Sequence, residues 1–308
     1  MREEGYQQLK HQVIEEAKEM RRINRVIPVT GKRYDLDVGD RKINVVFYPA
    51  SRKNAPLLLG FHGGGFLFGG NAMDDVMWSA IRDRLDMNVA SVEYRKSPEY
   101  QYRAALDDAY DAAVYLYHHA DAFGFDRERM SVMGCSAGAC LAATLCIYAK
   151  QKGGVTFEHQ VLLYPFLDAA TNPDEKGKGS LTGPVMHIFN ELHCRPEEAK
   201  DAVVSPVYAS GKEVAGLPHG ILVMADMDNL KQEGFRYAGM LEQAGVKTDV
   251  MLSSGMPHGF FELGFDDRKE GEMAFLPEEE KELIRSGEIA RAAGEALEFV
   301  AERLVGME

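Results

Sequence analysis

Apolar and polar residues follow two different rhythms along the chain. Near the N-terminus, apolar residues recur at three- and four-residue steps, which predicts an amphipathic helix over residues 9–27. Two following segments, 33–38 and 42–48, instead alternate apolar and polar positions on either side of Gly39-Asp40. That alternation around a turn-forming pair predicts a β-hairpin.

Six short apolar runs follow, each suited to a strand that is buried on both faces of a sheet. They are 56–61, 88–94, 130–133, 159–164, 220–225 and 248–252. Segments with helical spacing separate most of them or follow the last: 73–85, 104–123, 140–149, 230–244 and 287–304. Because strands that alternate with helices favour parallel pairing, the pattern predicts an α/β fold, with a mostly parallel central sheet and helices on both faces.

One stretch interrupts this alternation. Residues 167–205 begin with a polar, glycine-rich piece over 172–183 and continue with short helical patterns over 186–192 and 196–202. An insertion of this length in a compact domain usually carries function. The chain has no internal repeat and no low-complexity linker. We therefore expect one domain over 1–308, with a small helical cap built from about 1–30 and 167–205.

Charge and hydropathy exclude several classes of protein. The chain of 308 residues is 45% hydrophobic, which suits a globular protein with a substantial core. Its formal net charge of −13 argues against a nucleic-acid partner, because phosphate binding needs a face rich in lysine and arginine. No apolar run approaches the roughly 18 residues of a membrane span, and the N-terminus lacks a signal-peptide core. We expect a cytoplasmic protein, and the acidic stretch 266–282 is interpreted as solvated surface.

The cysteines indicate neither a metal site nor a disulfide framework. They lack the paired spacing of zinc ligands, and three of them lie in or just after one sharp turn, a poor frame for disulfides. They are Cys135, Cys140, Cys146 and Cys194. We interpret them as reduced side chains that fill space.

A candidate nucleophile lies between an apolar run and a helical segment, in Gly134-Cys135-Ser136-Ala137-Gly138. Gly-x-Ser-x-Gly in a strand–turn–helix context is the nucleophile elbow, in which glycines flank a crowded turn that exposes the serine hydroxyl. Alone, this pattern is weak evidence, because it also occurs by chance. A serine hydroxyl further needs a base to take its proton.

The candidate base is His258, in the loop after the last predicted strand. Functional groups of parallel α/β sheets gather on loops at the C-terminal strand ends, where Ser136 also lies. A carboxylate that orients the histidine should follow the preceding strand. Asp226 and Asp228 both lie there, and the residues alone leave the choice between them open.

A glycine-rich loop supplies candidate hydrogen-bond donors. His62-Gly63-Gly64-Gly65-Phe66 follows the strand over 56–61, and its backbone amides can point at one spot without side-chain obstruction. Such donors stabilise the oxyanion of a tetrahedral intermediate. The competing interpretation, a phosphate cradle, is weaker, because no Gly-Lys-Ser/Thr follows and the chain is acidic. We expect the amides of Gly64, Gly65 and Ala137 to form an oxyanion hole, and His62 to shape the loop.

Together these motifs resemble the hormone-sensitive-lipase-type branch of the α/β-hydrolases, over most of the chain. The matching pieces are His62-Gly-Gly-Gly-Phe66, Val92-Glu-Tyr-Arg95, Ser97-Pro98-Glu99, Ala105-Leu-Asp-Asp-Ala109, Gly134-x-Ser-Ala-Gly138, Ser205-Pro206, Asp228-x-Leu230-x-x-Glu233 and His258-Gly-Phe260. The resemblance implies the α/β-hydrolase fold with Asp228 as the triad carboxylate and Asp226 as its neighbour. It also implies a cap over the acyl pocket, and no cofactor or metal. The chain order Ser, Asp, His is the one expected of this fold.

Three residues depart from the family pattern. Cys135 replaces the usual Asp or Thr before the serine, and we interpret it as a packed, inert thiol. Asn229 replaces the usual proline after the acid, and Arg103 replaces another proline near 100–104. The stretch 264–287 is also longer than expected, which fits a further lid or a contact surface. These differences bear on the pocket and leave the triad intact.

The function that we expect is hydrolysis of small-molecule carboxylic esters, with short acyl chains, through Ser136, His258 and Asp228. Deacetylation of a sugar or xylan fragment and cleavage of amides or peptides remain alternatives, because the same constellation serves each. A binding protein without chemistry is a rival of another class, disfavoured because all three triad residues are present. The sequence leaves oligomeric state open, and a homo-oligomer is one option.

Overall fold

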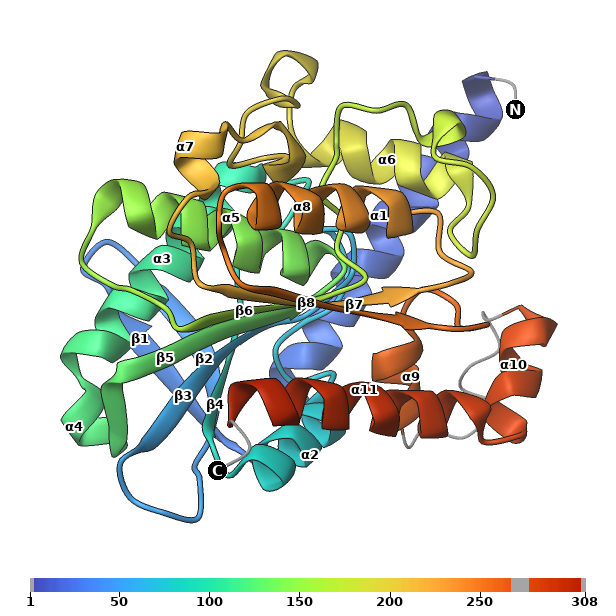
Figure 1. Ribbon diagram of the computed structural model, residues 1–308. Coiled ribbons are helices and arrows are strands. Elements are labelled where there is room, and N and C mark those ends of the chain that lie inside the picture. The colour runs from blue at the N-terminus through green and yellow to red at the C-terminus, as the bar shows by residue number, and fades with distance from the viewer. Residues whose placement is uncertain (1–2, 267–276, 306–308) are drawn as a thin grey trace.

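An eight-stranded sheet runs through the middle of the protein in the order β1-β2-β4-β3-β5-β6-β7-β8 (Figure 1). The computed structural model describes residues 3–266 and 277–305. The strands are β1 (Lys32–Asp37), β2 (Lys42–Tyr48), β3 (Ala55–Phe61), β4 (Asn88–Val92), β5 (Phe125–Cys135), β6 (His159–Leu163), β7 (His219–Ala225) and β8 (Thr248–Ser253). β1 and β2 form the predicted hairpin, β2 pairs antiparallel with β4, and the neighbours from β4 to β8 are parallel.

Helices cover both faces of the sheet, as Figure 1 shows. α3 (Tyr102–His118), α5 (Ala137–Lys152) and α8 (Lys231–Gln243) lie on one face, and α2 (Asp75–Leu85) and α11 (Glu288–Leu304) lie on the other. The remaining described helices are α1 (Glu3–Val26), α4 (Ala120–Phe123), α6 (Gly183–His193), α7 (Gly211–Val214), α9 (Phe260–Phe265) and α10 (Glu278–Arg285). The expected α/β fold with a mostly parallel sheet is therefore confirmed.

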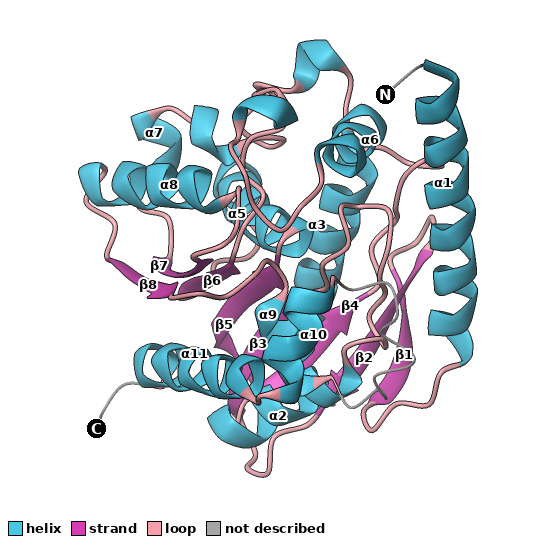
Figure 2. Cartoon of the chain, turned by 90° about the vertical axis from the view of Figure 1, so that its right-hand side faces the viewer, coloured by secondary structure: helices cyan, strands magenta, loops and turns pink. Residues whose placement is uncertain are grey.

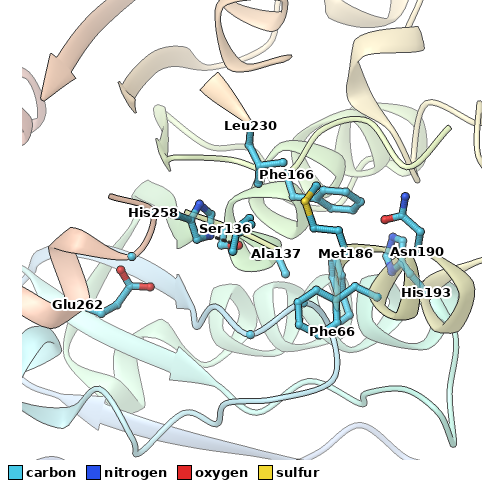
Figure 3. Close-up of a pocket in the computed structure, with 15 residues that line it drawn as sticks. Phe66, Ser136, Ala137, Phe166, Met186, Asn190, His193, Leu230, His258 and Glu262 are labelled. Carbon is cyan, nitrogen blue, oxygen red and sulfur yellow. Dashed lines mark hydrogen bonds between the residues drawn. The ribbon is translucent and has the colours of Figure 1, made fainter. Parts of the chain in front are cut away.

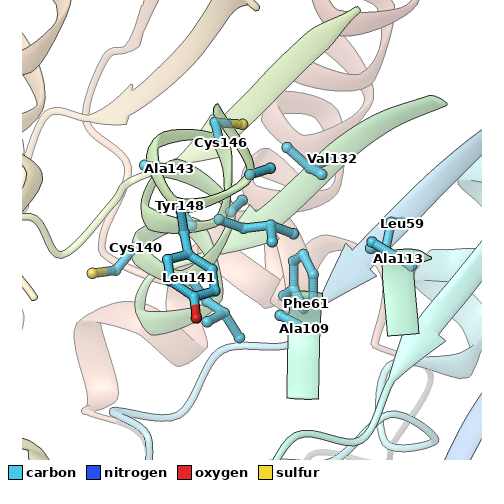
Figure 4. Close-up of a cluster of buried hydrophobic side chains, with 14 of the residues drawn as sticks. Leu59, Phe61, Ala109, Ala113, Val132, Cys140, Leu141, Ala143, Cys146 and Tyr148 are labelled. Carbon is cyan, nitrogen blue, oxygen red and sulfur yellow. The ribbon is translucent and has the colours of Figure 1, made fainter. Parts of the chain in front are cut away.

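The period of two in the strands explains why both faces need a cover. In β3, Leu57, Leu59 and Phe61 join the core beneath α3 and α5, whereas Leu58 points to the opposite core. Figure 4 shows Leu59 and Phe61 against small and aliphatic residues of α3 and α5. Both cores are built from closely packed, buried side chains, so the sheet is a fixed platform for the loops at its ends.

Several boundaries differ from the sequence prediction. The segment 104–123 forms two helices, α3 and α4, and 196–202 contributes only the 3₁₀ turn Pro196–Glu198. β8 was expected to be buried on both faces, but it is the last strand of the sheet and its Val250 and Leu252 are exposed. α9 and α10 were not predicted. They occupy part of the long stretch 264–287, whose residues 267–276 lie outside the described chain, as does much of the acidic segment.

The N-terminal helix and the 167–205 insertion lie next to each other (Figure 2). Val13 and Ala17 of α1 form a small apolar cluster with Leu67 and with Ile188 of α6. Two polar contacts join the same helices, because Glu191 accepts from the Tyr6 hydroxyl at 2.9 Å and from the Lys10 ammonium at 2.6 Å. None of the helices within residues 3–266 and 277–305 is long and apolar enough to cross a membrane.

Candidate active site

Ser136 lies on the sharp turn between β5 and α5. Its φ of 54° is in the left-handed region, which a serine rarely adopts, so the surrounding structure holds the turn in a strained conformation. A Cβ on Gly134 would lie 2.2 Å from the carbonyl carbon of Gly138, and one on Gly138 would lie 2.1 Å from the Phe61 oxygen. The two glycines are therefore required by space, and the elbow predicted from the motif is formed.

A chain of two hydrogen bonds leads from Ser136 into the protein. The Nε2 atom of His258 lies 2.8 Å from the Ser136 hydroxyl oxygen, and its Nδ1 atom lies 2.7 Å from Oδ2 of Asp228. The other carboxylate oxygen of Asp228 accepts from the Leu230 amide at 2.9 Å. The Asp228 side chain is fully buried, so its carboxylate is held by hydrogen bonds in a fixed orientation.

Asp226, the other candidate carboxylate, points elsewhere. Its side chain is exposed and forms an ion pair with Lys231 at 3.0 Å. The Lys231 hydrogen bond and the Gly255 amide hold the pKa of this carboxyl below its ordinary value. Of the two aspartates that the residues left open, Asp228 is the one that reaches His258.

The glycine-rich loop comes within reach of the serine at the end of β3. The carbonyl of Gly64 accepts from the amides of Leu67 and Phe68, at 3.0 and 2.7 Å, which folds the loop into a tight turn. Gly64 and Gly65 both have positive φ, and a Cβ on Gly65 would lie 2.6 Å from the Phe189 ring of α6. Both glycines line the same cavity as Ser136 and Ala137.

Ala137 is the first residue of α5. The amide groups of a helix's first turn have no acceptor within the helix, and the helix dipole favours negative charge at that end. An oxygen anion formed on a carbon attached to Ser136 would therefore lie near both the helix N-terminus and the glycine loop.

His62 is buried beneath the loop and stacks on Tyr94, with ring centroids 4.3 Å apart. Its Nδ1 lies 2.7 Å from the Gly63 carbonyl oxygen, and the Tyr94 hydroxyl donates to the His62 carbonyl oxygen at 2.8 Å. Burial lowers the pKa of His62 to about 3, so its imidazole is neutral. These contacts agree with a role in shaping the loop.

The cavity above Ser136 has a volume of about 180 Å³. Figure 3 shows His258 and Ser136 toward one side of it and His193 and Asn190 toward the other. Most of its wall is apolar, and α6 with the residues around it supplies much of that wall. Its apolar side chains are Phe66, Phe166, Leu181, Met186, Phe189 and Leu230.

Sequence reasoning missed four polar residues of this site. Ser180 accepts the His258 amide at 2.8 Å, and Glu262 lines the cavity from α9. Asn190 and His193 of α6 line it as well. None of the four lies in a recognised motif. Of the four, only Glu262 could have been placed near the site from the sequence, because it follows His258 by four residues.

The departures from the family pattern have structural roles. Asn229 exchanges two hydrogen bonds with Leu181, at 3.3 and 3.4 Å, and so fastens the insertion to the residue after Asp228. Cys135 is fully buried, and burial raises the pKa of its thiol well above the ordinary value, which disfavours a reactive thiolate. Arg103 donates to the Tyr148 hydroxyl at 2.6 Å, away from the cavity.

All four cysteines are buried free thiols. Within the described residues, no group of three or more His, Cys, Asp or Glu side chains is arranged to hold a metal ion.

Comparison with known proteins agrees with this geometry. A sequence profile of the alpha/beta hydrolase fold family matches residues 58–262, which run from within β3 to within α9 and include all of the candidate site residues. The chain is 33% identical over 228 residues to the carboxylic ester hydrolase LipN of Mycobacterium tuberculosis, covering 70% of this chain and 60% of that protein. It is 32% identical over 214 residues to an ethyl acetate hydrolase of Pseudomonas putida, covering 67% and 66%.

Among solved structures, the thermostable carboxylesterase EstE1 from a metagenomic library superimposes with a TM-score of 0.74 at 30% identity. That match covers 96% of this chain and 97% of EstE1. The two curated relatives are each covered over less than two thirds of their own length. The family profile and these relatives lead to one assignment: the chain belongs to the α/β-hydrolase superfamily, in its hormone-sensitive-lipase-like carboxylesterase family.

Proposed function

We propose that this protein is a serine carboxylesterase that hydrolyses small esters with short acyl chains. The observation that carries the proposal is the hydrogen-bonded series Ser136–His258–Asp228, which opens onto an apolar cavity beside the glycine loop. The names of the relatives, which include ester hydrolases and an ethyl acetate hydrolase, support the same reaction class. No cofactor and no metal ion takes part in it.

In the proposed reaction, the Ser136 oxygen attacks the ester carbonyl carbon while His258 Nε2 takes the hydroxyl proton. Asp228 accepts from His258 Nδ1, fixes the tautomer and stabilises the imidazolium ion. The amides of Gly64, Gly65 and Ala137 hold the oxyanion of the tetrahedral intermediate. His258 then protonates the leaving alcohol, and a water molecule, activated by the same histidine, releases the acid and restores Ser136.

We further propose that α1 and the segment 167–205 form a cap on a single α/β domain. Residues of this segment supply one wall of the cavity, and an ion pair between the largely buried side chains of Lys176 and Glu233, at 3.0 Å, ties it to α8. The cavity of about 180 Å³ lies below the roughly 300–1,000 Å³ of sites for drug-sized ligands. Such a cap restricts the substrate to small groups on at least one side of the ester.

The acyl-chain preference tests this function directly. Hydrolysis of p-nitrophenyl esters from acetyl to dodecanoyl should peak at about two to six carbons, because longer chains exceed the small cavity beneath the cap. Initial rates are measured at constant temperature against a buffer blank. A maximum at ten or more carbons would contradict the short-chain assignment, and the absence of turnover on every ester by folded protein would contradict the esterase.

The activity should also fall at alkaline pH because of Glu262. One of its carboxyl oxygens is completely buried without a hydrogen-bond partner among the described residues, and the other lies close to Gly63. Burial, helped by the charge of Asp74, raises the pKa of Glu262 to about 8. The carboxyl is therefore neutral at pH 7, and its ionisation places a negative charge beside the loop that must hold an oxyanion. We expect kcat/KM to fall as pH rises through 8, and Glu262→Gln to keep its activity to higher pH.

The stability of the folded protein should also fall as the pH rises, because of the same carboxyl. The carboxyl binds its proton more tightly in the folded protein than at its ordinary pKa of 4.5, so its contribution to stability falls as pH rises from about 4.5 to about 8. The Tm of wild type should decline more steeply between about pH 5 and pH 8 than that of Glu262→Gln. Identical pH profiles of the two proteins, in both activity and Tm, would show that Glu262 does not titrate in this range.

A further inference from the structure

The cavity wall contains buried polar atoms that the proposed reaction does not use. Both ring nitrogens of His193 and the Oδ1 atom of Asn190 are buried and have no hydrogen-bond partner within residues 3–266 and 277–305. Folded proteins pair nearly all their buried polar atoms, because an unpaired one has lost its hydration without compensation. The two side chains that carry these three atoms line one small cavity, which indicates that a bound molecule pairs with them.

His193 is held in a fixed position by aromatic rings. Its imidazole stacks on Phe66 with ring centroids 4.1 Å apart, and the rings of Phe166 and Tyr102 lie edge-on at 6.0 and 6.1 Å. Burial lowers the pKa of His193 to about 3, so the ring is neutral. A neutral imidazole presents one N–H donor and one acceptor nitrogen.

Asn190 lies three residues before His193 on α6, and residues at this spacing share a helix face. Its amide NH₂ donates to the Ala169 carbonyl oxygen at 3.2 Å, which fixes the orientation of the side chain and leaves Oδ1 as the acceptor. Figure 3 shows Asn190 and His193 together, on the side of the cavity away from Ser136 and His258. The two side chains thus offer a donor and acceptors at one place.

We propose that the part of the substrate held beneath α6 carries a hydroxyl group, which donates to Asn190 Oδ1 and accepts from the His193 ring N–H. The inference rests on the proposed ester hydrolysis and refines its substrate class to esters with a hydroxylated acyl or alcohol part. A hydroxyl is the smallest group that can donate and accept at once, which suits a cavity of about 180 Å³.

Charged substrate groups fit this place poorly. Among the described residues, the titratable side chains that line the cavity are His193, His258 and Glu262. The raised pKa of Glu262 keeps its carboxyl neutral near pH 7. A carboxylate or an ammonium would therefore be buried without an opposite charge, which is costly. A plain alkyl group would leave the polar atoms of His193 and Asn190 unpaired.

The rival occupant of this place is an ordered water molecule. Water could pair with the same atoms, and a hydroxylated substrate would then gain no preference.

The test compares each hydroxylated ester with the ester in which a methyl group replaces the hydroxyl. Methyl lactate and methyl 3-hydroxybutanoate (both enantiomers) are matched with methyl 2-methylpropanoate and methyl 3-methylbutanoate, and 2-hydroxyethyl acetate is matched with propyl acetate. The first two pairs vary the acyl part and the third varies the alcohol. We expect wild type to favour the hydroxylated member of at least one pair by about tenfold or more in kcat/KM, because a site built for a hydroxyl rejects the analogue that lacks it.

Substitutions of His193 and Asn190 test whether these two side chains cause the preference for the hydroxylated ester. His193→Phe and Asn190→Leu should bring the ratio of kcat/KM within the favoured pair close to one. His193→Gln, which retains a donor and an acceptor, should keep most of it. His187→Gln is the matched control on the same helix, because His187 is partly exposed and does not line the cavity. A ratio below about twofold in every pair, or a ratio that His193→Phe and Asn190→Leu leave unchanged, would overturn the proposal.

Binding separates this inference from the proposed function. Ligand-observed NMR with Ser136→Ala, which keeps the cavity but cannot form the acyl-enzyme, should show tighter binding of the same hydroxylated member. Lack of turnover on every ester would count against the esterase alone. Equal binding of both members of every pair would overturn the hydroxyl site even if ester hydrolysis were established.

Discussion

Replacing Ser136 with alanine is expected to lower kcat for ester hydrolysis by about a millionfold, the scale seen when the serine of such a triad is removed. The reason is chemical, because alanine has no oxygen with which to form the acyl-enzyme. The fold should be unaffected. Ala137 and Gly138 already continue the turn into α5, and the exchange deletes a single hydroxyl at its partly buried tip.

The measurement is the initial rate of p-nitrophenyl acetate or butyrate hydrolysis, with Tm and circular dichroism as checks of folding. Cys135→Ser is the matched control one position away. Its thiol is buried and its raised pKa holds the proton, so we expect this variant to keep most of the wild-type activity. Substantial turnover by Ser136→Ala would remove the serine from the mechanism. Complete inactivation by Cys135→Ser, with an intact fold, would give the thiol a role that we do not assign to it.

The parts of the site that the sequence predicted are those whose signal is local. The elbow requires glycines at 134 and 138 because the backbone passes within 2.2 Å of where their side chains would be, and this requirement leaves a pattern in five consecutive residues. The strand before the elbow and the helix after it can also be recognised from the sequence, because each has its own spacing of apolar residues. The same is true of the glycine loop after β3, so these elements could be located from the chain alone.

The parts that the residues alone left open, or that were missed, depend on contacts between distant segments. Both Asp226 and Asp228 follow β7, and the residues alone did not distinguish them, because the choice depends on which side chain faces the loop after β8. Asn190 and His193 come from an insertion that has no regular place in the parallel fold. The exposure of β8 was likewise unpredictable, since its apolar residues do not reveal that the strand has a neighbour on one side only.

The choice of carboxylate leads to the second large expected effect. Asp228→Asn should lower kcat by about 10⁴, the loss seen when a triad aspartate becomes an amide. Asparagine keeps the size of the side chain, but its NH₂ group cannot accept the proton of His258 Nδ1. The imidazole would then adopt the tautomer that carries its proton on Nε2, and that nitrogen could no longer take the proton of Ser136.

Asp226→Asn is the matched control, because it makes the same chemical change two residues away, where the carboxylate pairs with the partly exposed Lys231. Because His258 bonds Asp228 and not Asp226, we expect less than a threefold change in kcat. An ion pair of this kind contributes about 0–1 kcal/mol to stability, so the change in Tm should be small. The two variants should be compared over a range of pH on the same short-chain ester. If Asp226→Asn were the more damaging change, Asp226 would be the carboxylate that acts on His258, and the hydrogen bond of Asp228 would be structural.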